Sequence, residues 1–180
     1  MAKTPLKELY GRPGFLIRRA HQIAVSMFLE ETGALGITNR QYGILLVLKH
    51  RPGIDQITVA KLLGLDRSTA GMVLATLEKA GFVGRVVGAK DRRTRSLKLT
   101  PAGERMLARL AEPARRAQQR VLSVFTTKER KMFLELLDKF VRRFNDASRV
   151  PLEAHRAKRK GARTPELSFR PSAKRESRNP

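Results

Sequence analysis

The stretch from residue 58 to residue 103 most constrains what this chain can fold into, because it places two short amphipathic helices directly before an arginine-rich hairpin. Gly64 suits the C-terminus of the first helix, and Asp66 suits the N-cap of the second. Two helices joined by such a tight turn can present a helix end to the major groove of DNA. An arginine-rich ribbon after them can reach the adjacent minor groove. The pattern therefore predicts a protein that binds duplex DNA.

Charge is the second constraint on function. The 180 residues carry 38 Lys and Arg against 16 Asp and Glu, a formal net charge of +22. The last 32 residues hold ten of the basic and three of the acidic side chains, so most of the excess lies in the first 148. Such an excess favours polyanions, chiefly through the release of counterions from phosphates. Hydrophobic residues make up 41% of the chain, which is enough to build the core of one compact domain.

Several classes of site and protein are disfavoured by the composition. The chain has no cysteine, which excludes disulfides and thiolate zinc sites. His21, His50 and His155 are too scattered to suggest a metal site, so we expect neither metal nor cofactor. No GxxxxGK[ST] phosphate loop or recognisable Ser-His-acid arrangement occurs, and we therefore do not expect an enzyme. With no signal segment and no apolar run near ~18 residues, we expect a cytoplasmic, nucleoid-associated protein without a membrane partner.

Hydrophobic periodicity and helix caps predict a mainly α-helical fold, a winged helix-turn-helix with a two-stranded β wing and long helices at both ends. Thr38 with Gln41 and Thr126 with Glu129 form capping boxes, each of which opens a helix. We expect the long helix before the second box to be interrupted or bent near Pro113, because proline lacks an amide donor.

The helix that Asp66 opens is the candidate recognition helix. Its outward face carries small and apolar side chains, not the Arg, Asn or Gln that read bases in bidentate fashion. We therefore expect modest base discrimination that favours thymine-containing steps; the alternative is an ordinary surface helix. Close approach of the DNA backbone is one reason to keep Gly71, which costs about 1 kcal/mol against alanine in a helix. The predicted DNA contacts on this helix are Arg67, Ser68, Thr69, Met72 and Thr76.

The hairpin concentrates positive charge at its tip. A narrow A·T-rich minor groove has an enhanced negative potential that attracts inserted arginine. Asp91 interrupts the basic run, and we interpret it as a brace that orients Arg93. A solvated charge run is the alternative, but this run directly follows the paired helices. The predicted DNA contacts here are Lys90, Arg92, Arg93 and Arg95.

Three stretches carry a resemblance to a known family: DRST at the start of the recognition helix, LEKAGFV before the hairpin, and DRRTRSLKLTPAG across it. In these stretches, and in the order of helices over about residues 13–147, the chain resembles the MarR family of winged-helix regulators. The resemblance implies a homodimer on a palindromic operator in double-stranded DNA, and repression of nearby genes that a small ligand relieves. It also implies that Arg93 is the minor-groove arginine and Asp91 its partner.

The apolar faces of the terminal helices support a dimer independently. Exposed in a monomer, such faces would be an aggregation hazard, whereas a two-fold dimer buries them. A two-fold dimer also matches half-sites spaced by about one helical turn. We expect one domain over residues 1–148, with dimerisation helices at 13–37 and 101–147, a DNA-binding winged helix-turn-helix at 38–100, and a basic, disordered tail at 149–180. The tail either adds sequence-independent DNA affinity or is a solvated extension.

The segments RRAHQIAVSMF, TNRQYGILLVL and PGIDQ are similar to family members that govern catabolism of aromatic acids and hydroxycinnamates. The resemblance implies an effector that is an aromatic carboxylate or its coenzyme A (CoA) thioester. A guanidinium matches a carboxylate bidentately, and an imidazole can bond a phenol. Surface or interface roles for the arginine and histidine side chains in these segments stay open. Two other functions of the whole protein also stay open: an architectural DNA-binding protein and a regulator without a small-molecule effector. The candidate ligand contacts are Arg19, His21, Ser26 and Arg40.

Overall fold

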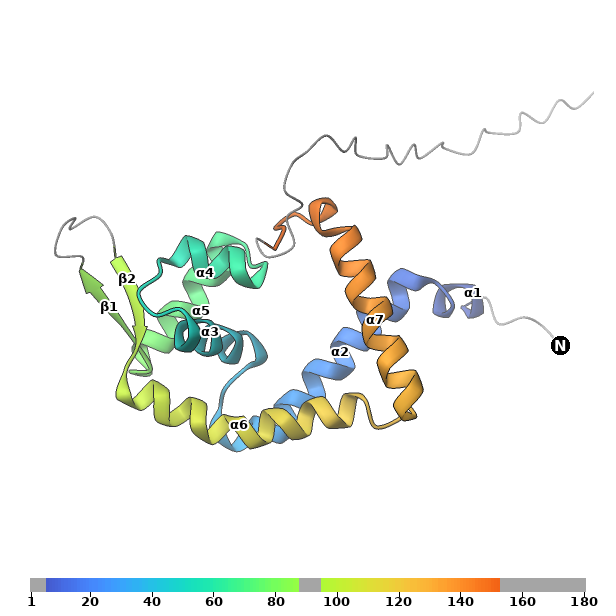
Figure 1. Ribbon diagram of the computed structural model, residues 1–180, viewed down its shortest axis with the longest axis horizontal. Coiled ribbons are helices and arrows are strands. Elements are labelled where there is room, and N and C mark those ends of the chain that lie inside the picture. The colour runs from blue at the N-terminus through green and yellow to red at the C-terminus, as the bar shows by residue number, and fades with distance from the viewer. Residues whose placement is uncertain (1–5, 88–94, 153–180) are drawn as a thin grey trace, which may run out of the picture.

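The computed structural model describes residues 6–87 and 95–152 and shows a mainly helical protein with a two-stranded antiparallel sheet (Figure 1). This architecture confirms the predicted winged-helix fold class. The elements in chain order are α1 (Lys7–Tyr10), α2 (Pro13–Thr32), η1 (Gly33–Leu35), α3 (Asn39–His50), α4 (Gln56–Leu63), α5 (Arg67–Lys79), β1 (Val83–Val87), β2 (Arg95–Leu99), α6 (Pro101–Val121), α7 (Thr127–Arg143) and η2 (Asn145–Ala147).

Side-chain caps set the helix starts, as the sequence predicts. At α3 the backbone amide of Gln41 donates to Thr38 Oγ1 over 3.3 Å, and the Thr38 amide donates to Gln41 Oε1 over 2.8 Å. The same reciprocal box opens α7. At the end of α4, Gly64 has φ +62°, the left-handed conformation expected of a glycine cap. These local bonds satisfy backbone groups that the helix itself leaves unpaired.

The wing is a short antiparallel ladder in which Val83 pairs with Leu99 and Val87 pairs with Arg95. The chain before α4 adds to it: the Leu97 amide donates to the Ile54 carbonyl, and the Gly53 amide donates to the Leu97 carbonyl, both over 2.8 Å. This extra bridge holds the wing against the start of the helix-turn-helix.

Two hydrophobic clusters form the interior, and α6 contributes to both. The smaller cluster packs Phe28 of α2 against Ala114 and Ala117 of α6. Tyr42 of α3 packs against both clusters, and its ring centroid lies 5.5 Å from that of Phe28. The larger cluster joins α3, α4, α5, the wing and the first half of α6; its buried members are Ile37, Ile44, Leu45, Leu48, Val59, Leu74, Leu77, Val83, Leu97, Leu107 and Leu110.

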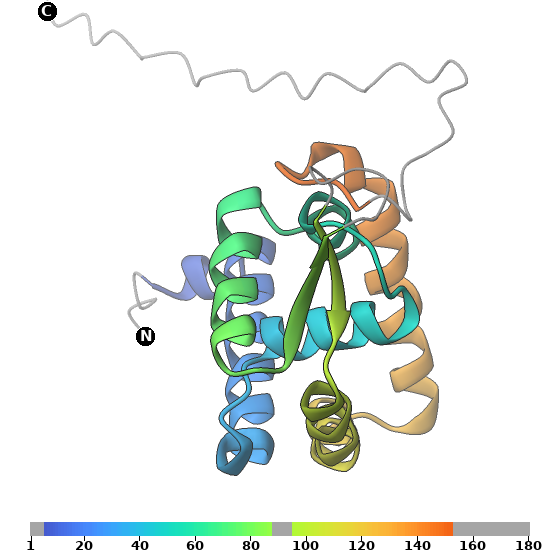
Figure 2. The same ribbon diagram turned by 90° about the vertical axis from the view of Figure 1, so that its left-hand side faces the viewer.

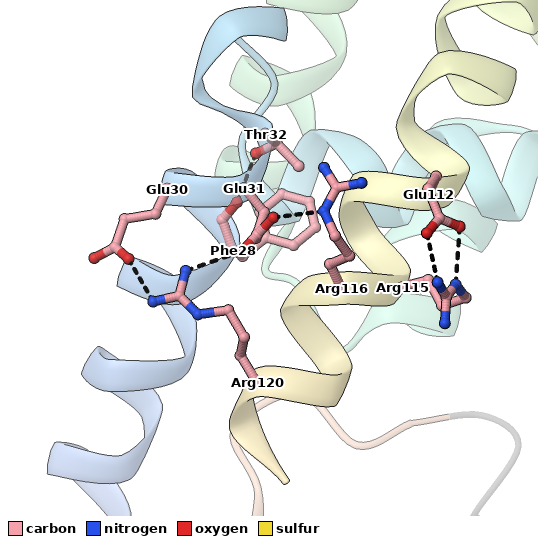
Figure 3. A network of polar contacts seen from close by, with 8 residues as sticks. All are labelled: Phe28, Glu30, Glu31, Thr32, Glu112, Arg115, Arg116 and Arg120. Atoms are coloured by element: carbon pink, nitrogen blue, oxygen red, sulfur yellow. Dashed lines mark hydrogen bonds and ion pairs between the residues drawn. The ribbon is translucent and has the colours of Figure 1, made fainter. Parts of the chain in front are cut away.

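Ion pairs fasten α2 to α6 beside the smaller cluster (Figure 3). Glu31 accepts from Arg116 Nε over 2.9 Å and from Arg120 over 3.0 Å, and Glu30 accepts from Arg120 over 2.8 Å. The Glu31 side chain is only 17% exposed. Hydrogen bonds from Arg116 and then Arg120 lower the pKa of the Glu31 carboxyl. We call these four residues the α2–α6 clamp.

The described C-terminal half differs from the sequence expectations at two points. The helix α6 continues through Pro113 without interruption from Pro101 to Val121. Its buried face on both sides of the proline packs into the two clusters, which opposes a break there. The predicted disordered tail starts too early, because Val150 and Leu152 are half-buried against the domain. These two apolar side chains pack where the basic composition suggested only solvent.

The helix α7 contributes no residue to either of the two clusters, and none of its residues is buried within the described part of the chain. Its apolar stripe is therefore open; for example, Leu136 is 58% exposed and Phe140 is 48% exposed. Apolar side chains on α1 and α2 are open as well, among them Leu9, Leu16, Ile17 and Ile23.

We expect Gly103→Ala to destabilise the fold by about 3 kcal/mol or more, because an added Cβ at this buried position would overlap the carbonyl oxygen of Phe82. Chemical denaturation measures the loss. Gly14→Ala is the matched control: an added Cβ there meets nothing within 4 Å, and alanine should raise stability by about 0.5 kcal/mol. Equal stabilities for the two variants would contradict the packing shown at the start of α6.

Acidification should weaken the α2–α6 clamp. Because the folded pKa of Glu31 is lowered, its contribution is full above the unfolded pKa of about 4.3 and is lost as the pH falls through the folded pKa. Glu31→Gln should therefore have a lower melting temperature than the wild type at pH ~7. The difference in melting temperature should become smaller at pH ~3. Glu104→Gln serves as the control, since Glu104 is 56% exposed and 3.5 Å from Lys49. A gap independent of pH would rule out the charged clamp.

Candidate DNA-binding and effector sites

The start of the recognition helix α5 is fixed by Asp66. Its carboxylate accepts from the backbone amide of Thr69 over 2.8 Å and from the Thr69 hydroxyl over 2.7 Å. The backbone bond and then the side-chain bond from Thr69 lower the pKa of Asp66, which keeps the cap charged at neutral pH. A negative cap also complements the positive end of the helix dipole.

The predicted DNA contacts on α5 differ in what they can offer. Arg67 and Ser68 are exposed, and Met72 is 64% exposed. Thr69 is half-buried and donates its hydroxyl proton to Asp66, while Thr76 donates its own to the carbonyl of Met72 over 3.0 Å. The two threonines can therefore present methyl groups and acceptor lone pairs to DNA, but their hydroxyl protons are already used.

Gly71 has a packing reason that the sequence reasoning missed. A Cβ at Gly71 would lie 3.0 Å from Nε2 of Gln56, at the first turn of α4. That amide donates to the carbonyl of Arg67 over 3.3 Å. Gly71 thus makes room for the Gln56 side chain, which joins the two helices of the helix-turn-helix. The group that comes close to Gly71 is therefore part of the protein. The predicted approach of DNA backbone is not needed to explain this glycine.

The wing is tied to the recognition helix by an ion pair. Arg85 Nε on β1 donates to Glu78 Oε1 on α5 over 2.6 Å, with the two side chains 33% and 27% exposed. Figure 2 shows the strands running beside α5. Helical or strand spacing alone gives no signal for this pair, because it spans the turn between a helix and a strand. The backbone of Arg95 lies in β2; the other predicted wing contacts and the brace, Lys90, Asp91, Arg92 and Arg93, lie outside the described residues.

A cavity of about 430 Å³ opens between α2, the start of α3, and the recognition helix. Among the described residues, its wall contains no carboxylate. Arg40 lies in the first turn of α3, where backbone amides and the helix dipole favour an anion. The cavity is therefore suited to a small ligand that combines apolar surface with negative charge. Its lining residues are His21, Val25, Leu29, Thr38, Asn39, Arg40, Gln41, Met72, Val73 and Thr76.

The four candidate ligand residues separate into two pairs. His21 and Arg40 line the cavity, whereas Arg19 and Ser26 are exposed on α2 and are not part of its wall. The apolar wall on α2 was missed, although His21, Val25 and Leu29 recur every four residues and so share one helix face. Ligand binding by any of these side chains stays a prediction.

Met72 and Thr76 connect the two candidate sites. Both were predicted to contact DNA, and both line the cavity from the recognition helix. A ligand in the cavity would therefore touch the helix that is predicted to enter the major groove. Within residues 6–87 and 95–152 we find no cluster of three or more His, Asp or Glu side chains that could hold a metal ion. In the same residues, no helix is both long and apolar enough to span a bilayer.

Comparisons with known proteins agree with this geometry. The profile of the MarR family matches residues 35–94. A protein of Thauera aromatica, described as a transcriptional regulatory protein for the hcr operon, is 32% identical over 133 residues, which span 73% of this chain and 80% of that protein.

Solved structures are similar over most of the chain. The transcriptional repressor CouR, bound to a 23-mer DNA duplex, has a TM-score of 0.71 and 28% identity, over 78% of this chain and 99% of that one. The PcaV transcriptional regulator of Streptomyces coelicolor, in complex with its natural ligand, has a TM-score of 0.66 and 31% identity, over 78% and 97%. The winged-helix fold, the match to the family profile and these similarities show that the chain belongs to the MarR family of transcriptional regulators.

Proposed function

We propose that the protein is a homodimeric transcriptional repressor whose operator affinity falls when an aromatic carboxylate, or its CoA thioester, occupies the cavity between α2, α3 and α5. The observation that carries this proposal is the shared wall of the cavity. His21 on α2 and Met72 on the recognition helix both line it. An occupant can thus change how the recognition helix sits on the rest of the domain. Bound to DNA, the protein would work at the nucleoid.

The chemistry of the wall supports the ligand class. Val25, Leu29 and Val73 offer apolar surface to a ring, and Arg40 offers a guanidinium fork to a carboxylate. The volume of about 430 Å³ is within the range of small-molecule pockets and suits a single-ring acid. The CoA part of a thioester would have to extend out of the cavity through its open side. PcaV, a relative with the same fold, has been solved with its natural ligand.

Three features support the DNA partner. The net charge of +22 favours a polyanion, Arg67 and Ser68 are exposed at the start of the recognition helix, and the wing is braced against that helix by Arg85 and Glu78. CouR, with the same fold, has been solved as a repressor on a DNA duplex. The small, methyl-rich face of the recognition helix predicts modest base discrimination. The shape of the DNA and its contacts with the wing would contribute the rest of the sequence specificity.

The open apolar surface supports a homodimer. Leu136, Leu137 and Phe140 on α7, and Phe144 at its C-cap, are each between 42% and 58% exposed. Further open apolar side chains lie on α1 and α2. A second copy can cover all of these faces through one two-fold axis, since the same surfaces then meet each other. Such a dimer presents two recognition helices to a palindromic operator.

Release would follow from a shift between two arrangements of the dimer. The ligand would bind more tightly to the arrangement in which the recognition helices no longer match successive major grooves, and it would thereby lower the affinity for DNA. DNA would lower the affinity for the ligand by the same factor. A coupling of about 1–3 kcal/mol corresponds to about 5- to 150-fold in affinity. The high charge favours a second candidate, an architectural DNA-binding protein without an effector, which would bind DNA with a steep salt dependence and little sequence preference.

Thermal shift against benzoates, hydroxycinnamates and their CoA thioesters tests the effector. A ligand at 100 times its dissociation constant should add about 2.7 kcal/mol of stability. Arg40→Ala should abolish the shift, whereas Arg19→Ala, on the same protein but outside the cavity wall, should keep it. The active compound should also release the protein from an operator selected out of random duplexes. A flat panel, or equal loss in both variants, would refute the ligand assignment.

Charge placed in the open stripe of α7 tests the dimer. Phe140→Asp should dissociate the dimer and reduce operator binding, because a carboxylate would be buried between apolar side chains without a partner. Sedimentation velocity measures the change in mass. Lys139→Asp, at an exposed neighbouring position, should remain dimeric. A dimeric Phe140→Asp variant would remove this face from the interface.

A further inference from the structure

The chain turns back sharply after α7 and closes on itself through one buried side chain. Asn145 is 6% exposed. Its Nδ2 donates to the carbonyl of Leu152 over 3.1 Å, and its Oδ1 accepts from the Leu152 amide over 2.9 Å. Within the loop, Ser148 Oγ also exchanges hydrogen bonds with the backbone of Val150 over 3.3 Å. We call residues 145–152 the C-terminal hook.

The hook lies against the turn of the helix-turn-helix. An added Cβ at Gly64 would lie 3.2 Å from Cδ2 of Leu152 and 3.4 Å from the carbonyl oxygen of Val150. Gly64 is the left-handed cap of α4, with φ +62°, and it is two residues from Asp66, which opens the recognition helix. The absence of a side chain at Gly64 thus serves both the turn and the contact with the hook.

The rest of α7 packs against little of the domain. At its N-terminal end the ring of Phe133 stacks on that of Phe125 in the turn after α6, with centroids 4.8 Å apart. Along its length no residue is buried by its own chain. Figure 1 shows α7 running from the end of α6 toward the end of α4, where the hook lies. The hook is therefore where the far end of α7 meets the DNA-binding unit.

We propose that Asn145 is a positioning residue for the recognition helix. Through the contact of Leu152 with Gly64, the hook joins α7 to the helix-turn-helix. The packing of α7 in the dimer interface then sets the distance between the two recognition helices. This inference rests on the proposed homodimer. The domain is then held from two sides, by α6 through the large hydrophobic cluster and by α7 through the hook. Loss of the hook leaves each recognition helix folded but allows the pair to vary in spacing.

The side chain at position 145 is chemically suited to this role. A primary amide donates and accepts at once, so it can pair with both backbone groups of Leu152 as a neighbouring strand would. An alanine would leave that amide and carbonyl without partners in a half-buried place, which disfavours the closed loop. An aspartate could accept but not donate. The exposed neighbour Asp146 lacks such a bond in the described residues and offers a matched control.

The absence of cysteine allows a direct measurement of spacing, because Ala75→Cys places a single reactive thiol on the exposed face of each recognition helix. With nitroxide labels there, pulsed dipolar spectroscopy on the full-length dimer gives the distance distribution. In this background, Asn145→Ala and Leu152→Ala should each broaden the distribution, and Asp146→Ala should leave it unchanged. Leu152→Ala keeps the backbone bonds to Asn145, so it tests the contact with Gly64 even if Asn145→Ala unwinds α7. Unchanged widths in both hook variants would overturn the inference.

Operator spacing gives the second measurement. Two base pairs inserted between the half-sites of an operator selected by the wild type rotate one half-site out of register. The insertion should lower the operator affinity of the wild type steeply and that of the hook variants less. The fold-loss of affinity should differ by a factor of about 5 or more between the wild type and the variants. Equal penalties would overturn the inference while leaving the repressor intact. A labelled wild type without any dipolar signal would instead refute the homodimer, and this inference with it.

Discussion

The sharing of α6 between two hydrophobic clusters is the constraint on which the rest of the structure depends. Leu107 and Leu110 complete the core of the helix-turn-helix, and one turn later Ala114 begins the contact with Phe28 on α2. A rigid helix that belongs to both clusters transmits the orientation of one to the other. Its continuity through Pro113 is therefore important, because a break there would uncouple the helix-turn-helix from the open apolar faces of the terminal helices.

Phe28 is the one large side chain in the buried cluster between α2 and α6 within the described residues, and polar groups add to this contact. The alanines of α6 allow the two helices to approach closely, and the clamp of Glu30 and Glu31 with Arg116 and Arg120 then fixes their register. Single exposed ion pairs contribute little. Here two arginines share two carboxylates, so one helix cannot slide without breaking several bonds. Because α2 also forms one wall of the cavity next to the recognition helix, the clamp holds that wall in place.

Local chemistry made much of the fold predictable. The caps at Thr38, Asp66 and Thr126 lie where their sequences predict, because a side chain that bonds a backbone amide three residues later needs no tertiary partner. Predictions failed where a distant residue decides the outcome. Pro113 does not break α6, since packing on either side supports it, and Gly71 faces Gln56 of another helix. Residues 149–152 read as tail, yet they pack on a turn far away in sequence.

By itself, the sequence determined the winged-helix class, the helix starts and a family resemblance strong enough to imply a DNA-binding regulator, because these depend on residue types at short spacing. Only the tertiary structure decided which side chains share a cavity. Helical periodicity gives the face on which His21 or Arg19 lies, but it cannot tell which neighbouring helix covers that face. Packing of α2, α3 and α5 brought His21 and Arg40 together with Met72 of the recognition helix and left Arg19 outside the wall. The contact of Leu152 with Gly64 was likewise set by the path of α6 and α7, which no local pattern encodes.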